Sequence, residues 1–152
     1  MQALSVAQLI PVLQTAIGPT ILISGVGLLL LTMTNRLART IDRTRATARE
    51  IVDASEDDRN KGRKQLRVLW GRARLIRLSI ALASTSALFA ALLIIVLFLT
   101  ALFQLDIAWL ICALFIACLV SLIGSLFVFI HDINQSLAAL KLELPAADLE
   151  AS

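Results

Sequence analysis

Long runs without a charged side chain flank one strongly basic segment of this chain. Residues 1–35 contain no Asp, Glu, Lys or Arg, and neither do residues 78–105 or 107–130. Residues 36–77 carry thirteen of the fourteen Lys and Arg residues. A charge at the centre of a lipid bilayer costs about 2.5–3.5 kcal/mol on insertion scales. The pattern therefore predicts apolar helices that cross a membrane, with a basic segment outside it.

The lengths of the apolar runs predict three membrane spans, because a helix needs about 20 residues to cross the hydrocarbon layer. The second span covers residues 78–103 and the third covers residues 107–130, with a tight turn at Gln104-Leu105-Asp106 between them. Gly18-Pro19 interrupts the first run. The first span is therefore placed at residues 19–37, since proline is well tolerated in a first helical turn.

Residues outside the spans are also expected to be helical. Residues 5–17 predict an amphipathic helix in the outer interface, and residues 38–77 predict a helical hairpin. Residues 131–144 extend the third span, and residues 145–152 form a frayed tail that begins at a proline. The predicted fold is all-α: one domain with three spans that continue into a cytoplasmic helical bundle.

Heptad-like spacing supports that bundle, because residues that alternate three and four positions apart share one helical face. Such seams occur at Leu37, Ile41, Thr44, Ala48 and Ile51; at Leu66, Leu69, Ala73, Ile76 and Ile80; and at Ile130, Ile133, Leu137, Leu140 and Leu144. Trp70 is expected to pack against the same bundle.

The charge of the basic segment predicts its side of the membrane. Residues 36–77 hold thirteen basic and six acidic residues, a net charge of +7. Loops rich in Lys and Arg stay in the cytoplasm, which places the N-terminus outside and the C-terminus on the cytoplasmic side of an inner membrane. Anionic lipids of the cytoplasmic leaflet are the expected partner. Nucleic acid is not expected, because acidic residues interleave with the basic ones and no aromatic residue of the segment precedes Trp70.

Small residues recur every four positions in the second and third spans. They are Ser79, Ala83, Ala87 and Ala91, and then Ala113, Ala117, Ser121 and Ser125. Such stripes let helix backbones approach closely in lipid. The two stripes either pack against each other or face a neighbouring subunit, and the sequence does not choose. Together with the three heptad-like seams, the stripes provide more packing surface than one protomer needs. A homo-oligomer is therefore expected.

The arginines nearest the first two spans are the main candidates for functional residues. They are Arg36, Arg39, Arg43, Arg72, Arg74 and Arg77. The first interpretation is a solvated face that fixes the orientation and contacts lipid phosphates. The second is a positive ring that lines the inner mouth of an oligomeric pore.

His131 and Asp132 form a candidate pair at the inner mouth, where the third span ends. In a single chain they are expected to be interfacial or packing residues, and in a ring they would form a gate or an ion ring. Cys112 and Cys118 match no metal motif and are interpreted as small apolar side chains. Motifs for catalysis, cofactors or metals are absent from the sequence, so an enzyme is not predicted.

Two stretches resemble a bacterial membrane family that is known as domain of unknown function 2721. They are Ala16-Ile-Gly-Pro-Thr-Ile-Leu-Ile-Ser-Gly25 and Thr34-Asn-Arg-Leu-Ala-Arg-Thr-Ile-Asp-Arg-Thr-Arg45, and Arg72-Ala-Arg-Leu-Ile-Arg77 is also similar. The resemblance covers roughly residues 10–143. It implies an integral membrane protein with three spans, and it implies no activity or functional residue.

Two functions are consistent with these features. The leading hypothesis is a homo-oligomeric, channel-like assembly with a basic cytoplasmic vestibule. The alternative is a non-conducting membrane adaptor whose basic hairpin binds anionic lipid or a cytoplasmic partner.

Overall fold

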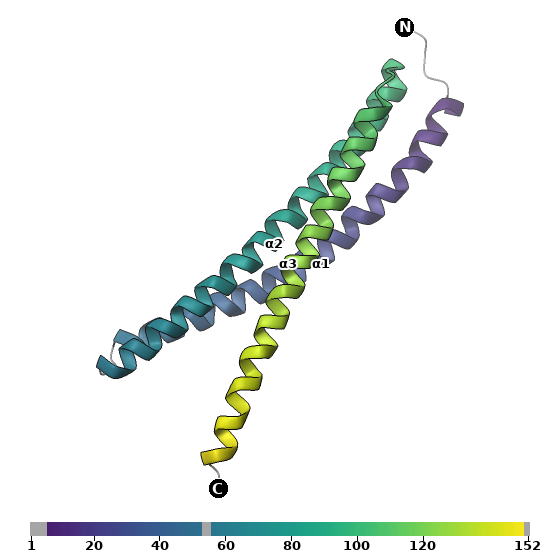
Figure 1. Cartoon of the computed structure of the whole chain (residues 1–152). Helices are drawn as coiled ribbons and strands as arrows, with labels where there is room; N and C mark the ends of the chain where they lie inside the picture. The colour runs from purple at the N-terminus through teal and green to yellow at the C-terminus, as the bar shows by residue number, and fades with distance from the viewer. Residues whose placement is uncertain (1–5, 53–55, 151–152) are drawn as a thin grey trace. The chain divides into compact units, whose positions relative to one another are not determined.

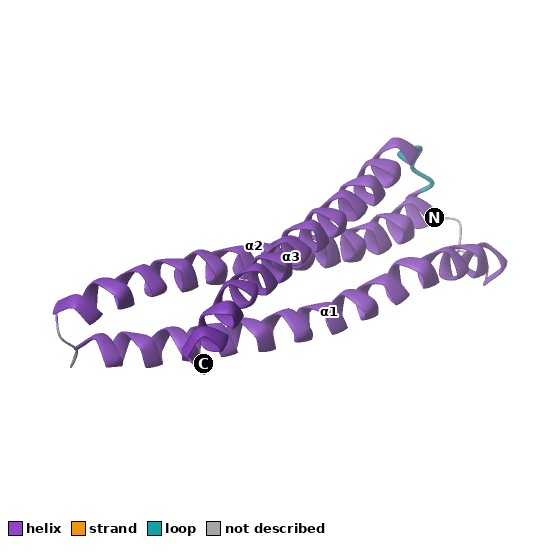
Figure 2. Cartoon of the chain, turned by 60° about the horizontal axis from the view of Figure 1, so that its bottom comes forward, coloured by secondary structure: helices purple, strands orange, loops and turns teal. Residues whose placement is uncertain are grey.

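Three long α-helices make up the described part of the protein in the computed structural model (Figure 1). They are α1 (Val6–Val52), α2 (Glu56–Phe103) and α3 (Ala108–Glu150). The structure describes the backbone of residues 6–52 and 56–150, and the side chains of residues 10–49, 62–63 and 66–135. Within the described backbone there is no strand, as the colouring of Figure 2 shows. The prediction of an all-α fold is confirmed.

All three helices are long and apolar enough to cross a membrane. The stretches that qualify are Ile10–Arg49, Leu66–Phe103 and Ala108–Gln135. Large hydrophobic side chains stay exposed on each of these helices, and Leu28 and Phe127 are both 70% exposed. Hydrocarbon chains of a lipid would cover such side chains. The prediction of three helices that are long and apolar enough to span a membrane is therefore confirmed.

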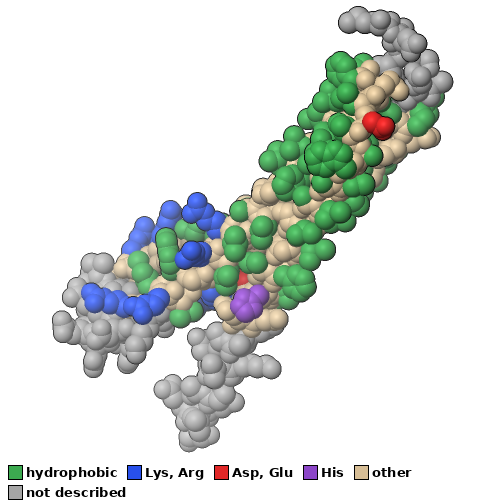
Figure 3. Space-filling model, turned by 45° about the horizontal axis from the view of Figure 1, so that its top comes forward, with side chains coloured by type: hydrophobic (Ala, Val, Ile, Leu, Met, Phe, Trp, Pro, Cys, Tyr) green, Lys and Arg blue, Asp and Glu red, His purple; other side chains and the backbone are tan. Residues whose placement is uncertain are grey.

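The helices associate in two compact units. The apolar unit comprises the described parts of residues 1–32 and 80–124, and the basic unit comprises those of residues 33–79 and 125–152. On the face drawn in Figure 3, the Lys and Arg side chains gather in one region. The single domain predicted from the sequence thus comprises two compact units of contacting helices.

α1 runs without interruption through Pro11 and Pro19. Residues 6–17 of the separate helix that was predicted for residues 5–17 thus form the first part of α1, and residue 5 lies outside the described residues. Hydroxyl groups supply local hydrogen bonds near both prolines: Thr15 Oγ1 donates to the carbonyl of Pro11 at 2.9 Å, and Thr20 Oγ1 donates to that of Ala16 at 2.8 Å. Proline is tolerated within membrane helices.

The turn between α2 and α3 lies where the sequence predicted it. Gln104 has a φ of 52°, in the left-handed region, and the backbone N–H of Leu105 donates to the carbonyl of Thr100 at 3.3 Å. This is the hydrogen bond of a Schellman motif, which ends a helix sharply. The Gln104 side chain donates to the carbonyl of Ala101 at 2.9 Å, so it satisfies a further group at the helix end.

Serine and cysteine side chains join α2 to α3 in the apolar unit. Ser86 Oγ donates to the carbonyl of Cys118 at 2.9 Å, and Cys118 Sγ donates to that of Ser86 at 3.3 Å. Ser121 Oγ donates to the carbonyl of Leu82 at 2.8 Å. Hydrogen bonds between a side chain and a facing backbone require helices that lie close together, which small residues permit.

The basic unit contains an equivalent contact, in which Ser125 Oγ donates to the carbonyl of Ser79 at 2.7 Å. Both serines are fully buried. The structure therefore brings serines from the two small-residue stripes into contact between α2 and α3 of one chain.

Only some residues of the two small-residue stripes are buried in the contact between α2 and α3. Ala83 is fully buried, whereas Ala87 and Ala91 are half-buried and Ala113 is exposed. Ala117 and Ser121 are half-buried. A step of four residues turns about 40° beyond a full circle, so a strict four-residue stripe drifts out of a straight contact.

On α2 the buried face of the apolar unit alternates steps of three and four residues. It consists of Ala83, Ser86, Ala90 and Leu93. Alternation keeps the mean step near 3.5 residues and holds the face against its neighbour.

Candidate functional site: an arginine cavity in the basic unit

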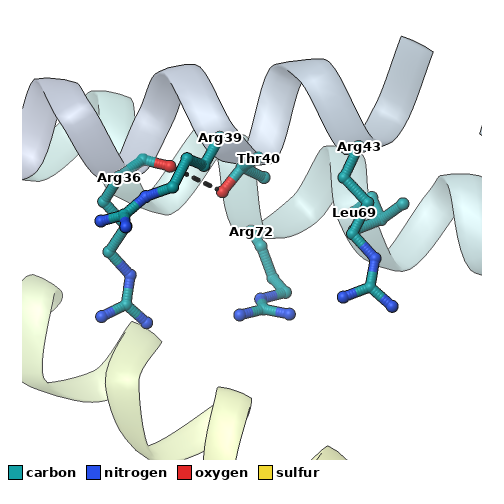
Figure 4. Close-up of a pocket in the computed structure, with 6 residues that line it drawn as sticks. All are labelled: Arg36, Arg39, Thr40, Arg43, Leu69 and Arg72. Carbon is teal, nitrogen blue, oxygen red and sulfur yellow. Dashed lines mark hydrogen bonds between the residues drawn. The ribbon is translucent and has the colours of Figure 1, made fainter. Parts of the chain in front are cut away.

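Four arginines from two helices line one cavity of about 300 Å³ in the basic unit. Its lining consists of Arg36, Arg39, Thr40 and Arg43 from α1 and of Leu69 and Arg72 from α2. The three arginines of α1 are three and four residues apart, so the helix presents them on one face. Figure 4 shows the guanidinium groups of Arg36, Arg43 and Arg72 projecting to the same side of the two helices. We call this site the arginine cavity.

A buried carboxylate from α3 holds two of these arginines. Asp132 is fully buried, and its Oδ2 atom lies 3.1 Å from Nη2 of Arg36. Its Oδ1 atom lies 3.9 Å from Nε of Arg72. The arginine side chains are only about a quarter exposed. These three residues, which we call the ion triad, connect all three helices of the basic unit.

Further contacts position Arg36 and its neighbour Thr40. The guanidinium carbon of Arg36 lies 5.6 Å from the centre of the Phe129 ring, a cation–π distance. Thr40 Oγ1 donates to the carbonyl of Arg36 at 3.0 Å, which the dashed line in Figure 4 marks. The Thr40 hydroxyl hydrogen is therefore used within α1, and the arginines are the donors that the cavity offers.

Arg39 and Arg43 are exposed and make no ion pair with any side chain that the structure describes. Four guanidinium groups and the single carboxylate of Asp132 give the site a formal charge of +3. Guanidinium groups stay protonated in proteins and match the oxygens of phosphate and carboxylate groups. The site is therefore suited to an anion.

The other two predicted arginines belong to a different groove of the basic unit. Arg74 and Arg77 line it together with Leu37, Ile41, Trp70 and Ala73, and its volume is about 450 Å³. The six candidate arginines thus divide into one set of four and one set of two.

The prediction that Trp70 packs against the bundle is wrong, because the indole is 72% exposed. α2 instead buries Ile76 completely. Six residues of helix place Trp70 about 120° around the axis from Ile76, which turns it away from the core.

His131 and Asp132 do not act as a pair in the structure. His131 is exposed, and its Nε2 atom lies 3.0 Å from Nε2 of Gln135. Asp132 points instead into the ion triad, because consecutive helical residues project about 100° apart. Sequence reasoning missed the association of Asp132 with Arg36 and Arg72.

The described residues contain no group of three or more His, Cys, Asp and Glu side chains that could hold a metal ion. Cys112 is exposed, whereas Cys118 is buried and hydrogen-bonded to Ser86. The two thiols thus have different environments, although both had been interpreted as small apolar side chains.

Comparison with known proteins gives one match. The sequence model of a family described as a protein of unknown function (DUF2721) matches residues 16–142. No curated protein and no solved structure matches the chain.

Proposed function

The chain belongs to the DUF2721 family of proteins of unknown function, and we propose that it is a membrane adaptor that binds anionic lipid. The observation that carries this proposal is the set of four arginines around one cavity. They lie on helices that are long and apolar enough to cross a membrane. Charge-assisted hydrogen bonds from guanidinium groups to phosphate oxygens are about twice as strong as neutral ones. The proposed role is binding and scaffolding, without catalysis.

The position of the cavity along the helices supports contact with lipid headgroups. Arg36 directly follows the uncharged residues 1–35, and Arg43 lies seven residues further along α1. Seven helical residues span about 10.5 Å. The headgroup layer on each side of the hydrocarbon core is about 5–8 Å thick. Arg36 and Arg39 therefore lie at the depth of the headgroups, and the long side chain of Arg43 can reach back toward them.

We propose that the basic unit faces the cytoplasm and that the turn after α2 faces the outside. In a protein without Cys112 and Cys118, a cysteine that replaces Asp57 should react with an impermeant maleimide only after the inner membrane is opened. A cysteine that replaces the exposed Asp106 should react in intact cells, because it lies at the other end of the span. Reaction at residue 57 in intact cells would contradict the orientation.

Lipid binding is expected to depend on the two arginines of the cavity that make no ion pair with a described side chain. The double variant R39Q/R43Q should retain phosphatidylglycerol at least tenfold less well than the unmodified protein. Each lost guanidinium removes a charge-assisted contact with the lipid phosphate. Native mass spectrometry of the protein in detergent, with phosphatidylglycerol and phosphatidylcholine added in equal amounts, measures this retention.

The matched control is R45Q/R49Q, which removes the same charge from exposed positions of α1 outside the cavity. At physiological salt it should stay within about threefold of the unmodified protein, because exposed charges are screened over about 8 Å. Equal losses in both double variants would show a diffuse charge effect and would contradict a lipid site. If the unmodified protein does not prefer phosphatidylglycerol to phosphatidylcholine, the adaptor proposal fails.

The rival function is a channel-like assembly of several copies, with the same arginines at its cytoplasmic mouth. Exposed hydrophobic side chains on all three helices are available to either lipid or further subunits. A channel predicts ion flux into liposomes beyond that into empty vesicles, and R36Q/R39Q/R43Q would change its selectivity. The adaptor requires no flux and would lose lipid or a cytoplasmic partner in that variant.

A further inference from the structure

We infer that the arginine cavity selects a phosphomonoester, the form of phosphate that carries two negative charges. The inference rests on the proposed function and makes it more specific, because it distinguishes one class of anionic lipid from the others. The shared chemistry is a terminal phosphate group, carried by a lipid such as phosphatidic acid or present as the free ion.

The charge of the site is the first argument. With four guanidinium groups and one carboxylate the cavity has a formal charge of +3. A phosphodiester such as that of phosphatidylglycerol carries one negative charge, whereas a phosphomonoester carries about 1.5 to 2 at neutral pH and has three acceptor oxygens. The monoester therefore neutralises more of the cavity and accepts more hydrogen bonds in it.

The second argument is that two of the four arginines contact Asp132 whereas the other two are exposed. Asp132 holds Arg36 and Arg72 in place, at 3.1 Å and 3.9 Å. These two arginines form a fixed positive wall that is supported by α3. Arg39 and Arg43 are exposed, so their side chains are available to fold over an anion beside that wall. Asp132 is thus a positioning residue, and Arg39 and Arg43 are the residues that would contact the ligand.

The third argument is that the residues of the ion triad are buried or half-buried. Asp132 is fully buried, and the Arg36 and Arg72 side chains that it contacts are only about a quarter exposed. The field of such partly buried guanidinium groups is screened less than that of exposed ones. It favours a dianion over a monoanion at the open side, where Arg39 and Arg43 lie.

A competition experiment on the full-length protein in detergent tests this selectivity. Phosphatidic acid, phosphatidylglycerol and phosphatidylcholine are added in equal amounts, and bound lipid is counted by native mass spectrometry. Phosphatidic acid should be retained at least tenfold better than phosphatidylglycerol. R39Q/R43Q should reduce that ratio to about one, and R45Q/R49Q should leave it unchanged within about threefold.

Inorganic phosphate at millimolar concentration distinguishes the two sources of the ligand. If it displaces phosphatidic acid from the unmodified protein, the cavity recognises the phosphate group by itself. If it does not, the cavity recognises the phosphomonoester as part of a lipid. Either result supports the inference, provided that the preference depends on Arg39 and Arg43.

Three results would overturn it, and they separate it from the adaptor proposal. Equal retention of phosphatidic acid and phosphatidylglycerol, both above phosphatidylcholine, ends the inference but leaves the adaptor proposal standing. A preference for phosphatidic acid that survives in R39Q/R43Q shows that the selective site lies elsewhere on the protein. Equal retention of all three lipids ends both proposals.

Discussion

Replacing Asp132 with asparagine is expected to lower the free energy of unfolding by about 3 kcal/mol. The substitution keeps the shape of the side chain and removes its charge. Arg36 and Arg72 would then face each other in the basic unit without the carboxylate that now lies between them. Removing one member of a buried ion pair is strongly destabilising because a charge stays behind in a poorly hydrated place. Ordinary surface substitutions change stability by less than about 0.5 kcal/mol.

Denaturant titration of the purified protein in detergent, followed by tryptophan fluorescence, measures the effect. The matched control is D106N, which makes the same change at an exposed residue and should leave stability unaltered. A triple variant, R36Q/R72Q/D132N, should recover part of the lost stability because no charge of the triad remains. If D132N and D106N unfold alike, the ion triad does not stabilise the basic unit.

The three membrane helices could be predicted because a bilayer imposes a simple rule on the sequence. Charged groups are excluded from hydrocarbon, so uncharged runs of sufficient length mark the spans. The predicted second span ended at residue 103, and α2 ends at Phe103. The continuity of α1 through Pro19 was not predicted. Proline usually marks a break in a soluble helix, and a membrane helix tolerates it where side chains compensate.

The ion triad was harder to predict because its members come from three separate segments. Adjacency in the sequence placed Asp132 with His131, and periodicity along single helices placed the arginines in a different set. A signal did exist. Arg36 is the first charge after residues 1–35, and Asp132 is the first charge after residues 107–130. Both positions follow the end of an apolar run, so residues at equal depth could have been compared between helices.

The partner of each small-residue stripe could not be predicted either. A stripe indicates that a helix backbone is approached closely, and it does not identify the neighbour. The structure shows serine contacts between α2 and α3 of the same chain, at Ser121 and Ser125. These contacts use part of the packing surface on which the expectation of a homo-oligomer rested.

Enlarging Ala83 to leucine is expected to destabilise the contact between α2 and α3 in the apolar unit by about 2 kcal/mol. Ala83 is fully buried on the same face of α2 as Ser86, whose hydroxyl reaches the carbonyl of Cys118. Three additional carbon atoms cannot fit there unless the helices move apart. The movement would lengthen the hydrogen bonds of Ser86 and Ser121, which depend on close backbones.

The thiol of Cys118 reports this separation directly, because it is 1% exposed and lies in the same contact. In a C112S background, a fluorogenic maleimide should label Cys118 at a lower denaturant concentration in A83L than in the parent protein. The matched control is A81L, which adds the same side chain two residues away at an exposed position of α2. Both variants make the helix equally more hydrophobic, so membrane insertion does not distinguish them. Labelling of A83L and A81L at the same denaturant concentration would show that close approach at Ala83 is not needed to hold the two helices together.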